Sequence, residues 1–135
     1  DVLGPRFIDA YKVANYQAGL RLNLAKRMEN PNRPKTITIL QQSVRIGDAV
    51  MVTFPCEVFS EIGLKIKQQS PMKKTFVIGI AGAMGGYLPT AEEFKEEGYA
   101  GLISPFPPKA EQSLIDSSIQ MIGKVQDVNL EKKRD

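Results

Sequence analysis

Apolar residues near the amino terminus recur every three or four positions between Arg6 and Glu29. The recurring positions are Phe7, Tyr11, Ala14, Ala18, Leu22 and Ala25, and Leu20, Leu24 and Met28 widen the apolar face. This spacing predicts an amphipathic helix. The helix should end at residues 30–34 (NPNRP), because proline lacks an amide hydrogen and disfavours helix in the residue before it.

The next two segments have the composition of strands. Residues 36–46 are rich in β-branched side chains, and residues 49–54 are more apolar still. Gly47-Asp48 between them is a turn sequence, so the two segments are predicted to form a hairpin that ends at Pro55. The candidate inward positions of the first strand are Ile37, Ile39, Val44 and Ile46.

Helical and strand patterns alternate in the second half of the chain. Residues 57–69 return to helical spacing, and Lys74 to Ile80 is an almost continuous apolar run, typical of a strand buried on both faces. The capping-box sequence 90–93 (TAEE) predicts a short helix that ends at Gly98. Residues 111–126 should form the last helix, with Ile115, Ile119 and Ile122 facing inward.

The strand–helix–strand order in the middle indicates a parallel pair of strands. The predicted fold class is therefore α/β, with a mixed sheet that contains a βαβ unit and is flanked by helices. We expect residues 1–135 to be part of a larger α/β domain.

Two oxygen-bearing side chains follow the ends of the two central strands. Glu57 comes just after the strand 49–54, at the start of the next helix, and Tyr87 follows the strand 74–80. In a right-handed βαβ unit both side chains lie at the carboxyl-terminal edge of the sheet, where open α/β folds bind ligands. They could be metal ligands, or an acid and the group that orients it. Alternatively, the glutamate complements a helix dipole and the tyrosine is a packing residue.

A glycine-rich loop precedes Tyr87 and contains Gly79, Gly82, Gly85 and Gly86. A phosphate-binding P-loop ends in Gly-Lys-Ser/Thr, and this loop has neither the lysine nor the hydroxyl. We expect Gly85 and Gly86 to support a tight path that delivers Tyr87 to the edge of the sheet.

The chain contains no histidine and one cysteine, Cys56. The absence of histidine excludes Ser-His-Asp and Cys-His catalysis, and any histidine-containing zinc site, within these 135 residues alone. Cys56 lies close to a predicted helix start, where a lowered pKa would favour a nucleophilic thiolate. The alternative role is that of a small buried apolar residue.

Charge and hydropathy exclude two classes of partner. The net charge of +3 is spread along the chain, without the basic face and stacking aromatics of a nucleic-acid-binding surface. No stretch approaches the roughly 20 apolar residues that cross a membrane. We therefore expect neither a nucleic-acid partner nor a transmembrane segment.

Residues 43–101 resemble the carboxyl-terminal part of the catalytic domain of neutral, non-lysosomal ceramidases. The most specific motifs are Gly47-Asp48 through Pro55-Cys56-Glu57, and Gly86-Tyr87-Leu88-Pro89-Thr90. These enzymes hydrolyse the amide of ceramide with one zinc ion. The resemblance implies that Glu57 and Tyr87 are zinc ligands, that histidines upstream of this region complete the site, and that a lipid-like substrate is bound. It also favours a secreted, periplasmic or cell-surface location.

Two departures from the family pattern suggest an alternative. Residues 1–5 (DVLGP) align with the family motif G-D-V-S-P, but Leu3-Gly4 replaces the serine that acts in amide cleavage. Cys56 stands where relatives commonly have glycine. The chain could therefore belong to a non-catalytic relative that binds a ligand or partner. A stand-alone module is less compatible with the strand 74–80, which needs cover from an upstream segment of the same protein.

Overall fold

The computed structural model describes residues 5–32, 36 and 38–128. The elements in chain order are α1 (Pro5–Glu29), β1 (Gln42–Ile46), β2 (Ala49–Thr53), β3 (Glu57–Val58), α2 (Ser60–Gln69), β4 (Lys74–Ile78), β5 (Tyr87–Leu88), α3 (Ala91–Lys95), α4 (Tyr99–Ile103) and α5 (Ala110–Gln126). Residues 1–4 (DVLG), for which the sequence suggested a changed serine motif, lie outside the described residues.

A mixed three-stranded sheet forms the centre of the fold, in the order β1-β2-β4. β1 and β2 form an antiparallel hairpin around Gly47, whose φ of 60° is accessible to glycine. β2 and β4 are parallel and are connected through α2. The predicted α/β class and its βαβ unit are confirmed.

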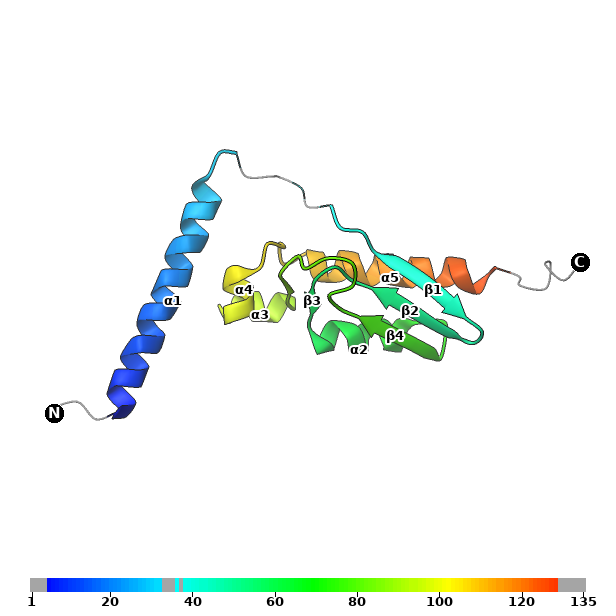
Figure 1. Cartoon of the computed structure of the whole chain (residues 1–135), viewed down its shortest axis with the longest axis horizontal. Helices are drawn as coiled ribbons and strands as arrows, with labels where there is room; N and C mark the ends of the chain where they lie inside the picture. Colours follow the sequence, from blue (N-terminus) through cyan, green and yellow to red (C-terminus); the bar gives the residue numbers. More distant parts are fainter. Residues whose placement is uncertain (1–4, 33–35, 37, 129–135) are drawn as a thin grey trace, which may run out of the picture.

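The core lies between one face of this sheet and the helices α2 and α5 (Figure 1). Val50 and Val52 of β2 are fully buried against Ile62 and Ile66 of α2 and Ile115 and Ile122 of α5. Burying one such side chain stabilises a fold by about 1.5–3 kcal/mol. The inward face predicted for the last helix is confirmed, with Ile119 half-buried beside the core.

The opposite face of the sheet is open within the described part of the chain. Val44, Met51 and Phe76 are register partners and form one row across that face, on which Val44 is 47% and Phe76 is 55% exposed. Ile78, two residues after Phe76 on the same strand and 38% exposed, extends the apolar surface. The two-faced apolar pattern of residues 74–80 predicted a need for cover beyond the helices of this chain, and the described helices cover only one face.

Of the inward positions predicted for the first strand, Val44 and Ile46 were wrong and Ile39 was confirmed. Val44 and Ile46 point outward, because the hairpin register places Ser43 opposite the buried Val52. Arg45, also on the inward side, donates through Nη1 to the Gln126 carbonyl oxygen at 2.7 Å, at the end of α5. Ile39 is half-buried against the core, and Ile37 lies outside the described residues.

Three element boundaries differ from the prediction. β1 begins at Gln42 rather than at residue 36, and α2 begins at Ser60 rather than at Glu57. The backbone amide groups of Glu57 and Phe59 donate to the segment that contains β5, so these residues extend instead of entering the helix. α3 ends at Lys95, before Gly98.

α1 stands apart from the sheet, beside α4 (Figure 1). Most of its described side chains are exposed, and an ion pair joins Arg21 to Glu97 at 2.5 Å. Among the residues that the structure places, no helix is both long enough and apolar enough to cross a membrane.

The open apolar face leads to a prediction about residues 1–135 produced alone. We expect an aggregate, or a molten species that binds a hydrophobic dye, because the row of Val44, Met51 and Phe76 remains in water. Attaching an upstream segment of the protein that covers this face should restore a cooperative melting transition. A monomer with a sharp transition and no dye binding would contradict the prediction.

Candidate functional site

Two short strands bring Glu57 and Tyr87 together. β3 and β5 are parallel, with Glu57 opposite Tyr87 and Val58 opposite Leu88. The Glu57 amide donates to the Gly86 carbonyl oxygen at 2.9 Å, and the Phe59 amide donates to that of Leu88 at 3.1 Å. Register partners project to the same side of a sheet. Because Leu88 is fully buried on one side, the half-buried Glu57 and Tyr87 share the other.

The path of the glycine-rich loop explains how Tyr87 reaches this position. The Gly85 amide donates to the Pro55 carbonyl oxygen at 2.6 Å, and a Cβ on Gly85 would lie only 2.9 Å from that oxygen. Gly86 has a φ of 82°, and a Cβ there would lie 3.1 Å from Pro105 Cδ. Both positions therefore require glycine for the observed approach.

The Glu57 carboxylate influences the phenol of Tyr87. The pKa of Tyr87 is raised, first by the negative charge of Glu57, then by burial, and further by hydrogen bonding with Glu57. The phenol therefore stays neutral at physiological pH and can donate a hydrogen bond to the carboxylate. The pair presents adjacent oxygen atoms on one surface.

Helix α4 holds Tyr87 from both of its ends. The Ser104 hydroxyl, at the carboxyl end of α4, donates to the Tyr87 carbonyl oxygen at 2.9 Å. The ring of Tyr99, at the amino end, meets the Tyr87 ring edge-on, with 6.0 Å between centroids and 73° between planes. Sequence reasoning missed both residues, since neither stands in a recognisable motif. The glycine before Tyr99 indicated only a helix stop.

The geometry tests two further interpretations, a helix-dipole role for Glu57 and a phosphate-binding role for the glycine-rich loop. Glu57 precedes α2, and the acidic residue in the first turn of that helix is Glu61, so a helix-dipole role for Glu57 is wrong. The glycine-rich loop runs into β5, whereas a P-loop runs directly into the N-terminus of a helix. The loop therefore lacks the geometry of a P-loop.

Cys56 is fully buried within the core. Burial raises the pKa of its thiol to about 11, so the lowered pKa expected of a nucleophile was wrong. The thiol remains protonated at neutral pH. The side chain of Cys56 acts as a small apolar group. The backbone carbonyl oxygen of Cys56 accepts a hydrogen bond from the Ile80 amide at 3.0 Å.

The donor set at this edge fits part of a metal centre. Glutamate and tyrosine supply oxygen ligands, but the described residues contain no cluster of three or more His, Cys, Asp or Glu side chains. A catalytic zinc usually takes three protein ligands and a water molecule. Glu57 and Tyr87 could thus hold one side of such an ion, with ligands from elsewhere completing it.

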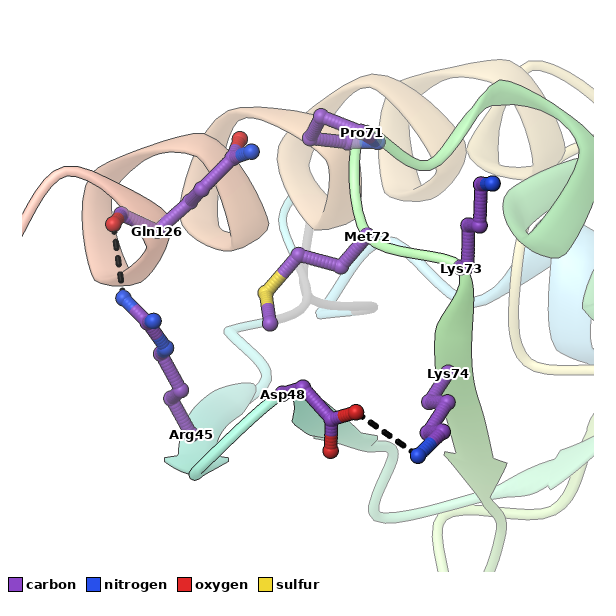
Figure 2. Close-up of a pocket in the computed structure, with 7 residues that line it drawn as sticks. All are labelled: Arg45, Asp48, Pro71, Met72, Lys73, Lys74 and Gln126. Carbon is purple, nitrogen blue, oxygen red and sulfur yellow. Dashed lines mark hydrogen bonds and ion pairs between the residues drawn. The ribbon is translucent and has the colours of Figure 1, made fainter.

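Two surface hollows lie near the sheet. One, of about 350 Å³, is formed at the other end of β4 (Figure 2). Its charged groups are largely paired: Lys74 with Asp48 at 2.7 Å, and Arg45 with Gln126. The other, of about 280 Å³, lies between α2 and β4 and is lined mainly by apolar side chains, without Glu57 or Tyr87.

Comparison with solved structures finds the neutral ceramidase of Pseudomonas aeruginosa, with a TM-score of 0.59 and 21% sequence identity. The match covers 74% of this chain and 17% of the ceramidase chain. Identity at this level shows a shared fold. No protein-family model matches the chain, and the search of curated proteins finds no significant match. The observed α/β architecture is thus similar to a portion of a neutral ceramidase.

The burial of Cys56 predicts a slow thiol. In the intact protein at pH 8, we expect alkylation of Cys56 by iodoacetamide to be at least about 100-fold slower than in the unfolded protein. A thiol pKa raised by about two units reduces the thiolate population by that factor. Mass spectrometry of the Cys56 peptide measures the rate.

The same raised pKa predicts a pH dependence of stability. The contribution of the protonated Cys56 to the free energy of unfolding is fully present below the pKa of the unfolded thiol, near 9, and is lost as the pH rises towards about 11.

In the alkylation experiment, equal labelling rates in the folded and the unfolded protein would refute the assignment of Cys56 as a buried residue.

Proposed function

We propose that this chain is the carboxyl-terminal portion of the catalytic domain of a zinc-dependent hydrolase of the neutral ceramidase type. The observation that carries the proposal is the register pairing of Glu57 with Tyr87 on one surface of the sheet edge. The fold around this pair is similar to part of a neutral ceramidase. The reaction class is hydrolysis of an amide or ester bond.

Glu57 and Tyr87 would be two of the zinc ligands. Carboxylate oxygen is a common zinc ligand, and a phenol can join it when a cation offsets its raised pKa. The remaining ligands would come from an upstream segment of the protein, because this chain has no histidine. When bound, zinc polarises a carbonyl group and activates water for attack.

We take the substrate to be lipid-like because the fold is similar to part of a neutral ceramidase. The hollow between α2 and β4 is lined by Val58, Phe59, Leu64 and Val77. Because Val58 lies on the side of β3 opposite to Glu57, this hollow is not assigned to the candidate site.

A non-catalytic binding domain is the second candidate. It is favoured by Leu3-Gly4, which replaces the serine of the family motif. Metal content separates the two candidates. The intact protein, produced in zinc-supplemented medium, should contain close to one equivalent of zinc if it is the hydrolase. Less than a tenth of an equivalent per chain would rule that function out.

The ligand assignment predicts the behaviour of two variants. We expect Glu57→Gln and Tyr87→Phe each to weaken zinc binding by the intact protein at least about tenfold, since each removes one ligand. Both residues are half-buried at an edge outside the apolar core, so the thermal midpoint of the metal-free protein should change little. Competition with a chromogenic chelator measures the affinity.

Glu61→Gln is the matched control. Glu61 is an exposed carboxylate in the first turn of α2 whose side chain interacts with Ser60, so its loss should not alter zinc affinity. A Glu57 or Tyr87 variant that binds zinc as tightly as this control would show that the substituted residue is not a ligand.

A further inference from the structure

Three tyrosine rings form a continuous row from the candidate ligand pair to α1. The ring of Tyr87, on β5, meets the ring of Tyr99, on α4, edge-on at 6.0 Å. The other neighbour of Tyr99 is Tyr16 of α1, whose ring stacks on it with 6.2 Å between centroids and 19° between planes. The row therefore joins α1 to β5 and α4, which both lie far from it in the sequence.

The middle of the row is held firmly by the corner between α3 and α4. Glu93, in α3, accepts through Oε1 from the Ala100 amide at 3.2 Å, in the first turn of α4. The Glu93 carboxylate also fills the space where a Cβ on Gly98 would lie. The Ser104 hydroxyl ties the other end of α4 to Tyr87. The backbone at Tyr99 is thus fixed relative to β5.

The side chain of Tyr99 is less constrained than its backbone. It is 48% exposed, and the two neighbouring rings supply its aromatic contacts. Removing Tyr16 would free one face of the Tyr99 ring and open other rotamers to it. Tyr87 would then lose the fixed edge contact that limits its own rotation.

Among the α1 residues whose side chains the structure describes, few other contacts hold the helix in this place. Figure 1 shows the helix standing beside α4, away from the sheet. Tyr16 is 57% exposed, and the Arg21–Glu97 ion pair lies at the surface, with both side chains more than half exposed. Exposed ion pairs of this kind are weak. A hydroxyl contact with Tyr99 accompanies the stack and raises the pKa of Tyr16.

We propose that Tyr16 is a positioning residue for the candidate site: its ring holds Tyr99 against Tyr87 and thereby links α1 to the site. The proposal rests on the proposed function in that it takes Glu57 and Tyr87 as the working pair. Its physical basis is preorganisation, since a ligand whose rotamer is already limited loses less conformational freedom on binding.

The test uses the intact protein and two measurements. The first is zinc affinity by chelator competition. We expect Tyr16→Ala to weaken binding three- to tenfold, and Tyr16→Phe, which keeps the ring but removes the hydroxyl, to stay within twofold of the unchanged protein. Val13→Ala is the control, because Val13 is an apolar residue of α1 that is 56% exposed and is not part of the row of tyrosine rings. Its affinity should not change.

The second measurement reports the ring itself in the absence of metal. A 3-fluorotyrosine placed at position 87 gives a ¹⁹F resonance that depends on the orientation of the neighbouring ring. Tyr16→Ala should shift or broaden this resonance, whereas Tyr16→Phe and Val13→Ala should leave it in place. If Tyr16→Ala unfolds the protein, Arg21→Gln replaces it. Loss of the Glu97 ion pair should loosen α1 and move the resonance in the same direction by a smaller amount.

The outcomes separate this inference from the proposed function. A ¹⁹F resonance and a zinc affinity that are both unchanged in Tyr16→Ala would overturn the positioning role, even where Glu57→Gln abolishes zinc binding. A moved resonance in a protein that binds no zinc would support the row of rings and overturn the zinc-dependent function. A zinc affinity lost equally in Tyr16→Ala and Tyr16→Phe would overturn the role of the ring.

Discussion

Backbone hydrogen bonds between residues 54–59 and residues 78–88 hold the candidate site in place. The Phe54 amide donates to the Ile78 carbonyl oxygen at 2.8 Å, and the Ala81 amide returns to that of Phe54 at 2.9 Å. Four further backbone hydrogen bonds join the two segments, the last of them from the Phe59 amide to the Leu88 carbonyl oxygen. Because Phe54, Pro55 and Cys56 are buried, their polar backbone groups would otherwise be left without partners, at a cost of about 1–3 kcal/mol each. Both segments must therefore leave the sheet side by side.

This pairing accounts for residue types that are otherwise hard to explain. The backbone approach at Pro55 leaves no room for a side chain on Gly85, and the turn that follows requires the positive φ of Gly86. Cys56 lies between β2 and β3 along the chain, at a fully buried position where a small apolar side chain fits. The same constraint that closes the loop sets Tyr87 opposite Glu57. The proximity of the two oxygen-bearing side chains thus follows from backbone geometry and needs no attraction between them.

Sequence reasoning reached the parts of this arrangement that depend on local pattern. The periodicity of residues 111–126, the turn at Gly47-Asp48 and the capping box at Thr90 each produced the expected element. The parallel strands placed Glu57 and Tyr87 at one edge, as the order of elements implied. Predictions failed where a neighbour far along the chain decides the outcome: β5 draws residues 57–59 into extended pairing, and the buried Val52 turns Ser43 inward in place of Val44. Tyr16 and Tyr99 could not be predicted, because two isolated tyrosines carry no signal that they will meet.

The open sheet face and the proposed metal site place different requirements on a segment that would pack against this chain. An added layer that only covered the row of Val44, Met51 and Phe76 would satisfy the hydrophobic requirement without approaching Glu57 and Tyr87. The donors at Glu57 and Tyr87 lie at the end of the sheet, beyond the last register partners of β2 and β4, Thr53 and Ile78. A segment that served both purposes would have to pack on the open face and extend past its carboxyl-terminal edge. The proposed hydrolase needs such a segment to carry the remaining ligands. A purely structural cover does not need that reach, so the position of the covering segment relative to Glu57 distinguishes a catalytic domain from one that keeps only the fold.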